Sequence, residues 1–133
     1  MSPHTIDTRL KQLITDTAPS LLEVHGVGLD TAASLLVTAG DNPDRLRSEG
    51  SWAHLCGVTP IPASSGKTTR HRLNRGGDRH ANAALYRIVL TRMSSDPRTK
   101  AYITRRRAEG RSNREIIRCL KRYVARETFK HLT

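Results

Sequence analysis

Residues 21–40 read LLEVHGVGLDTAASLLVTAG: an apolar run, a Gly-x-Gly turn, and a second apolar run in which aliphatic residues recur at helical spacing. Gly26 and Gly28 suit the tight turn because glycine adopts positive φ without a steric penalty. Asp30 is placed to cap the second helix, and Gly40 is placed to end it. The stretch therefore predicts helix, tight turn, helix, and a mainly α fold.

The turn itself has two interpretations. In a helix-hairpin-helix element, backbone N–H groups of Gly26, Val27 and Gly28 bind a DNA phosphate without reading the base sequence. In the simpler interpretation, the stretch is an αα-corner with a glycine cap. The small residues Ala32 and Ala33 permit close helix packing and favour the DNA-binding element, whereas the acidic surroundings argue against strong phosphate affinity.

The sequence on both sides of this stretch is also helical in pattern. Residues 5–17 carry apolar residues at helical spacing, and the predicted helix ends before Pro19. Further helices are expected from the N-cap Ser51 to Cys56, from the N-cap Asp78 to Ser94 or Ser95, from Pro97 to the terminator Gly110, and from a capping box at Ser112 to about Phe129. Strand patterning is weak, and only residues 68–73 suit a short β-hairpin. We expect a compact, mainly α domain.

The length of 133 residues suits one domain. We expect residues 1–18 to form an N-terminal helix or the remnant of a linker helix. Residues 19–133 would then form the domain proper, with the helix-hairpin-helix at 21–40 and a basic loop at 57–80. No apolar run approaches the ~20 residues of a membrane span, and the N-terminus lacks the apolar core of a signal peptide. These features predict a cytoplasmic protein that does not contact a membrane.

The net charge of +11 lies in the C-terminal part of the chain. Residues 1–50 hold four Lys and Arg against seven Asp and Glu, and residues 51–133 hold nineteen against five. Such polarity favours a nucleic-acid partner, because basic groups that displace condensed counterions gain affinity. Aromatic residues make up only 4% of the chain, which argues against a platform for stacking single-stranded bases. The last helix carries a basic face that is either solvated or follows phosphates: Arg114, Arg118, Lys121, Arg122 and Arg126.

The cysteines and histidines do not form a recognisable metal motif. Cys56 and Cys119 lie far apart with no CxxC pattern, so we expect buried thiols. The six histidines show no ligand spacing, and we assign no metal to this chain.

Residues 56–80 read CGVTPIPASSGKTTRHRLNRGGDRH and combine prolines, serines, glycines and cations, which predicts a basic loop. Ser64 to Thr68 resembles the end of a nucleotide-binding P-loop. Ile61 occupies the position of the first P-loop glycine, so we exclude nucleotide binding. A serine in this loop has two interpretations. Its hydroxyl could attack a phosphodiester, or Ser65 could serve only to stabilise a turn by bonding to its own backbone. The cations that would neutralise phosphate charge are Lys67, Arg70, Arg72, Arg75 and Arg79.

Four short motifs occur in a fixed order: Gly26-Val27-Gly28, Gly57-Val58-Thr59-Pro60, Ser65-Gly66 and Gly76-Gly77-Asp78. This order, spread over residues 21–130, resembles the C-terminal domain of the IS-one-ten family of insertion-sequence transposases, which includes IS-one-sixteen and IS-nine-oh-two. The resemblance implies a DNA-binding and strand-transfer domain. Its serine nucleophile would be Ser65, with Ser64 as the contender, and it would form a covalent phosphoserine intermediate with DNA.

The resemblance also implies partners and a cofactor. Family members join this domain to a RuvC-like domain whose four acidic residues bind Mg²⁺, so no cofactor is expected in this chain. They act on double-stranded DNA under the direction of a structured guide (bridge) RNA, as homo-oligomers in the bacterial nucleoid. Residues 1–20 hold no comparable acidic cluster, because Asp7 and Asp16 stand isolated.

The chain alone is therefore expected to bind nucleic acid without recombining it, as an excised piece or a truncated reading frame. The alternative is a non-catalytic helix-hairpin-helix module that binds nucleic acid.

Overall fold

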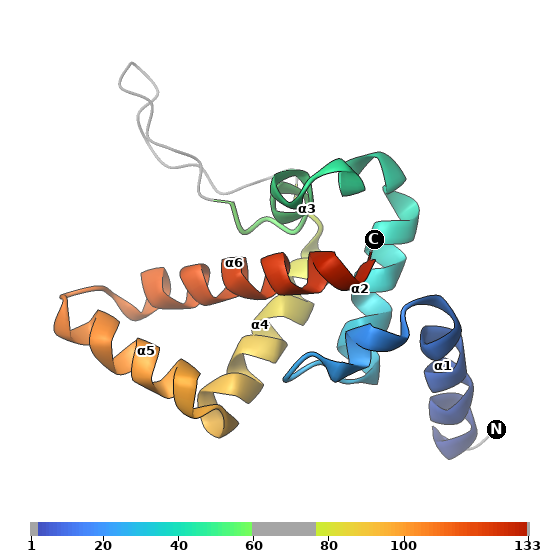
Figure 1. The fold of residues 1–133 in the computed structure, drawn as a ribbon, viewed down its shortest axis with the longest axis horizontal. Coiled ribbons are helices and arrows are strands. Elements are labelled where there is room, and N and C mark those ends of the chain that lie inside the picture. The colour runs from blue at the N-terminus through green and yellow to red at the C-terminus, as the bar shows by residue number, and fades with distance from the viewer. Residues whose placement is uncertain (1–2, 60–76, 133) are drawn as a thin grey trace.

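The computed structural model describes residues 3–59 and 77–132, with side chains from Thr8 onward (Figure 1). Its α-helices are α1 (Pro3–Thr17), α2 (Leu29–Asp41), α3 (Glu49–Leu55), α4 (Arg79–Ser95), α5 (Pro97–Ala108) and α6 (Asn113–Leu132). Two 3₁₀-helices, η1 (Pro19–Glu23) and η2 (Pro43–Arg47), join the first of these. The described ranges contain no strand, so the predicted mainly α fold is confirmed. The hairpin expected at 68–73 lies outside the described residues.

The core forms where α4 lies between α2 and α6. Leu35, Leu85 and Ile88 contribute side chains that solvent does not reach. Trp52 of α3 is equally inaccessible, and its indole Nε1–H donates to Thr128 Oγ1 on α6 at 3.4 Å. Burial of such large apolar side chains is the main source of folding stability in a domain of this size.

Local capping chemistry sets several helix ends as expected. Asp78 caps α4, because its carboxylate accepts from the Ala81 N–H at 2.8 Å. Ser112 Oγ accepts from the Glu115 N–H at 3.2 Å at the start of α6. Gly110 ends the α5 region with φ +87°, a conformation that favours glycine.

Two predicted caps are wrong. Helix α2 begins at Leu29 with Gly28 as its N-cap, so Asp30 lies in the first turn, where a carboxylate favours the helix dipole. Ser48, rather than Ser51, caps α3, because Ser48 has the extended backbone of a cap and accepts from the Ser51 N–H at 3.1 Å.

The helix expected before the Gly-x-Gly turn also differs. It is the five-residue 3₁₀-helix η1, with proline at its start. Only a few residues lie between Pro19 and the turn at Gly26, which leaves no room for a full α-helix. The helix-hairpin-helix assignment therefore stays a prediction.

Helices α5 and α6 diverge from a tight turn at residues 109–112, and α4 crosses between their far ends (Figure 1). Helix α1 lies on the opposite side of the domain and packs against α2. None of the described helices is long and apolar enough to cross a membrane. Helix α6 also packs against α3 and η1, so the basic C-terminal helix contacts the N-terminal elements directly.

The two thiols differ in environment. Cys56 is fully buried, and burial, followed by the charge of Asp78, raises the pKa of its thiol far above the usual range. Cys119 is only partly buried. The expectation of a buried thiol is confirmed for Cys56 alone.

Candidate nucleic-acid interface

Described residues on either side of segment 60–76 are hydrogen-bonded to each other. The Asp78 N–H donates to the Leu55 carbonyl at 2.6 Å. Asn82, one turn into α4, donates its amide Nδ2–H to the Cys56 carbonyl at 3.0 Å. The residues that precede and follow segment 60–76 therefore lie together, and we call them the segment base: residues 55–59 and 77–82.

Helix α6 brings cations to the segment base. Lys121 Nζ donates to Asn82 Oδ1 at 3.2 Å, and Arg122 Nη1 donates to Thr59 Oγ1 at 2.9 Å. Burial, followed by the nearby charge of Arg118, lowers the pKa of Lys121. Sequence reasoning left the basic face of α6 open between a solvated and a phosphate-binding role. Two of its members, Lys121 and Arg122, bond within the chain here, and both roles of the face stay predictions.

Of the predicted basic site residues, Arg79 is the one within the described ranges. It lies exposed in the first turn of α4. It borders a hollow of about 270 Å³ that includes Gly57, Gly77 and Asn82. The remaining residues predicted for this site fall in segment 60–76, outside the described residues: Ser64, Ser65, Lys67, Arg70, Arg72 and Arg75.

The Gly26–Gly28 turn contributes mainly to packing. The Val27 N–H donates to the Val24 carbonyl at 3.0 Å, and the Gly28 N–H donates to Thr31 Oγ1 at 2.9 Å. These two predicted phosphate donors are therefore engaged within the chain. The turn does border an open hollow of about 410 Å³ that also includes Arg87, so its role in phosphate binding stays a prediction.

Gly26 has a clear structural reason to be glycine. Its φ is +90°, and a Cβ there would lie 3.0 Å from the Ile88 carbonyl oxygen of α4. At Gly28, φ is −103° and a Cβ would meet no atom within 4 Å. The two glycines of one motif thus have different roles.

Gly26→Ala is expected to lower the free energy of unfolding by about 2–3 kcal/mol. Alanine would be strained at this positive φ, and its Cβ would press against the Ile88 carbonyl oxygen. Gly28→Ala is expected to cost less than about 1 kcal/mol, since only the cap preference changes. Urea denaturation of both variants measures the difference. Equal losses would contradict the packing role of Gly26.

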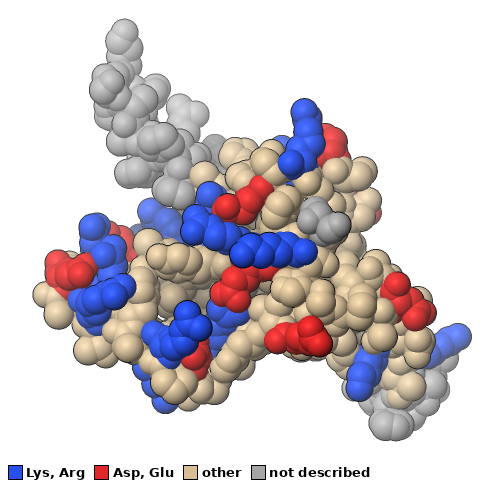
Figure 2. All heavy atoms as spheres, viewed as in Figure 1, with Lys and Arg blue, Asp and Glu red and all other residues tan. Residues whose placement is uncertain are grey.

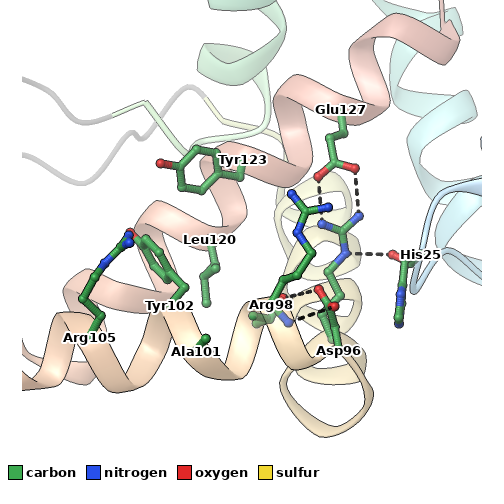
Figure 3. A pocket seen from close by; sticks show the side chains of 11 residues that line it. His25, Asp96, Arg98, Ala101, Tyr102, Arg105, Leu120, Tyr123 and Glu127 are labelled. Atoms are coloured by element: carbon green, nitrogen blue, oxygen red, sulfur yellow. Dashed lines mark hydrogen bonds and ion pairs between the residues drawn. The ribbon is translucent and has the colours of Figure 1, made fainter.

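A hollow of about 910 Å³ lies between α4, α5 and α6 (Figure 3). Its central group is Arg92, whose side chain is 10% exposed. Arg92 Nε donates to the His25 carbonyl at 2.8 Å, and its two Nη atoms donate to Glu127 at 2.9 and 3.2 Å. Asp96, at the edge, caps α5 through Thr99 Oγ1–H at 2.7 Å. These polar groups are engaged in holding the fold together.

A second hollow, about 430 Å³, lies between α5 and α6 beside Val58. We call it the arginine hollow. Its cations are Arg105, Arg106, Arg118, Arg122 and Arg126, and its rings are Tyr102 and Tyr123. Figure 2 shows Lys and Arg side chains gathered over α5 and α6 on this face. The convergence of these cations was not predicted from the sequence, because it depends on the turn that brings α5 and α6 together.

The described residues contain no group of three or more His, Cys, Asp or Glu side chains that could hold a metal ion. Cations gathered over neighbouring helices of a small domain are typical of proteins that bind polyanions.

Comparison with known sequences gives the family. Residues 18–104 match the family described as "Transposase IS116/IS110/IS902 family". A 43.6 kDa protein of insertion element IS110 from Streptomyces coelicolor is 33% identical over 106 residues, which are 79% of this chain and 26% of that protein. A 42 kDa protein of insertion element IS900 from Mycobacterium paratuberculosis is 27% identical over 106 residues, or 79% of this chain and 27% of that protein.

The chain belongs to the IS116/IS110/IS902 transposase family, which confirms the resemblance found in the sequence. It matches about a quarter of the length of the two relatives. Membership of a transposase family favours a transposase domain over the alternative of a non-catalytic binding module.

Proposed function

We propose that this chain is the DNA-binding and strand-transfer domain of an insertion-sequence transposase. The structural observation that supports this most directly is the segment base, where Lys121 donates to Asn82 and Arg122 donates to Thr59. Cations held there would lie close to the phosphate on which the serine acts, and fixed positive charge stabilises a phosphoryl transition state.

The proposed chemistry is one phosphoryl transfer. Ser65 Oγ, or Ser64 Oγ as the contender, forms a bond to phosphorus as the bond from phosphorus to a deoxyribose oxygen breaks. The serine gives up its proton and the leaving oxygen takes one up. Nearby cations stabilise the charge on the five-coordinate phosphorus: Lys67, Arg70, Arg72 and Arg75. Mg²⁺ bound to a RuvC-like domain would assist when that domain is present.

The proposed partners are double-stranded DNA and a structured guide RNA, in a homo-oligomer. The family resemblance supports the guide RNA. A second copy that packs on α1 would cover Leu13, which is 64% exposed.

DNA binding is tested by reversing single charges in two parts of the domain. Arg79→Glu, at the segment base, is expected to weaken binding to a short duplex by about 10-fold or more and to reduce the salt slope of the affinity by about 0.9 for the lost phosphate contact. Fluorescence anisotropy at several salt concentrations measures both quantities.

Arg9→Glu on α1 is the matched control, because Arg9 is also exposed and the net charge changes equally. It is expected to change the affinity by less than about 2-fold, since distant exposed charges are screened by salt. Equal losses in both variants would show that only the net charge matters, and would contradict a localised interface.

A further inference from the structure

We infer that the arginine hollow binds an unpaired nucleotide, with its phosphate on the arginines and its base against Tyr123. The inference rests on the proposed nucleic-acid-binding function and goes further, because it specifies which part of a nucleic acid this surface takes. Three properties of the hollow carry it: uncompensated positive charge, rings that hold guanidinium groups in place, and a recessed shape.

The positive charge of the hollow exceeds what its carboxylates neutralise. Glu49 is shared between Arg122, at 3.2 Å, and Arg126, at 3.4 Å. Among the described residues, no carboxylate lies within ion-pair distance of Arg105 or Arg118. The guanidinium groups of Arg105 and Arg118 are thus available to an anion. Arg122 and Arg126 share a single carboxylate, so part of their charge is available as well.

The carboxylate that does line the hollow is already engaged. Glu115 pairs with Arg111 at 3.2 Å, outside the hollow, and also accepts from Ser112 Oγ–H at 3.2 Å. Those hydrogen bonds, first from Arg111 and then from Ser112, hold the pKa of Glu115 below its usual range. An entering phosphate would therefore meet a net positive surface.

Aromatic rings hold several of the arginines. The guanidinium groups of Arg105 and Arg106 lie over the Tyr102 ring, 5.5 and 5.8 Å from its centroid. Arg126 lies 5.9 Å from the Tyr123 centroid. The two rings meet edge to face at 5.9 Å. Because cation–π contacts leave the charge of the guanidinium unneutralised, the arginines are positioned without losing their attraction for phosphate.

The shape of the hollow selects an unpaired nucleotide. In a duplex the bases are stacked inside, so a ring recessed between two helices meets only the sugar-phosphate backbone. A base that has left the stack is able to enter and stack on an aromatic or guanidinium plane. Tyr123 is 47% exposed, which leaves room for that contact. Figure 3 shows Tyr123 and Tyr102 on facing helices, with Arg105 beside Tyr102.

The position of the hollow connects it to the proposed chemistry. Val58 of the segment base lines it, and Arg122 both lines the hollow and donates to Thr59 of the segment base. A nucleotide bound there would lie next to the point where the chain enters segment 60–76. The low aromatic content of the sequence argued against base stacking. Two of the three tyrosines nevertheless converge on this one hollow, which revises that expectation.

The test compares a short duplex with the same duplex carrying a bulge of unpaired nucleotides, made once in DNA and once in RNA. Tyr123→Ala is expected to weaken binding to the bulged probe by about 10-fold, within the range for loss of one stacked base, and to leave binding to the plain duplex unchanged. Tyr123→Phe is expected to retain the preference for the bulge, because the ring remains. The RNA and DNA arms identify which nucleic acid supplies the nucleotide.

Tyr86→Ala is the matched control. Tyr86 is 40% exposed and has Lys121 over its ring at 6.0 Å, but it lies outside the hollow. It should leave both affinities unchanged. Arg118→Ala, at an exposed position of α6, gives a second variant should Tyr123→Ala fail to fold, and it is expected to weaken binding to the bulged probe more than to the duplex.

The outcomes separate the two proposals. Duplex binding with no preference for the bulge, or a preference that both Tyr123→Ala and Arg118→Ala leave intact, overturns the nucleotide site and leaves the DNA-binding function standing. Absence of binding to every probe overturns the proposed function itself. A bulge built from abasic sites should lose the preference, and equal binding to it would overturn the role of the base.

Discussion

Ser65→Ala is expected to lower the rate of strand exchange by on the order of 10³-fold or more, while DNA affinity stays unchanged. Without Oγ no bond from this residue to phosphorus can form, so the covalent step is lost. The hydroxyl carries no charge, and the cations that would hold the phosphate remain. The measurement requires the domain joined to its RuvC-like domain and guide RNA, with strand exchange and the covalent protein–DNA adduct both followed on denaturing gels.

Ser64→Ala is the matched control for that experiment, because it removes the neighbouring hydroxyl from the same segment. It is expected to retain strand exchange and the adduct. The reverse pattern would assign the reaction to Ser64. Undiminished exchange in both variants and in the double variant would refute the serine mechanism.

Trp52→Ala is expected to lower the free energy of unfolding by about 3–5 kcal/mol. The indole of Trp52 is fully buried between α3 and α6, so alanine leaves a cavity that the surrounding helices fill only in part. Total stability of a domain this size is about 5–15 kcal/mol, so the variant would be partly unfolded at moderate urea concentration. Urea denaturation followed by circular dichroism measures the loss.

Two variants serve as controls for Trp52→Ala. Trp52→Phe keeps a buried ring and is expected to lose distinctly less stability. Leu13→Ala truncates an apolar side chain that is 64% exposed, and is expected to change stability by less than about 0.5 kcal/mol. A loss for Leu13→Ala as large as that for Trp52→Ala would contradict the position of the core.

The sequence was sufficient for features set by neighbouring residues. The caps Asp78 and Ser112 and the terminator Gly110 follow from chemistry within one helical turn, and the structure confirms all three. The N-cap of α2 was predicted wrongly. The Asp30 carboxylate was expected to cap the helix, whereas the cap is Gly28, whose backbone bonds to the Thr31 hydroxyl. Local competition between two plausible caps cannot be resolved from composition alone.

Features that depend on distant residues could not be predicted. Arg92 lies in the apolar pattern of α4. Its hydrogen-bond partners are the His25 carbonyl, just before the Gly26–Gly28 turn, and the Glu127 carboxylate of α6. Likewise Tyr102 and Tyr123 belong to different helices, and only the turn between α5 and α6 brings their rings together. The role of Ser65 as nucleophile was proposed from the family resemblance. A serine in such a loop is equally suited to forming a turn, so the residues alone do not assign that role.

The hydrogen bond from the Asp78 N–H to the Leu55 carbonyl closes the chain on itself around segment 60–76. The entropy cost of closing a flexible chain between fixed ends rises only with the logarithm of its length, by about 0.6 kcal/mol for each doubling. Insertions and deletions between these two anchors would therefore leave the stability of the helical domain almost unchanged. Among relatives, we therefore expect length differences to fall in this stretch rather than in the described helices.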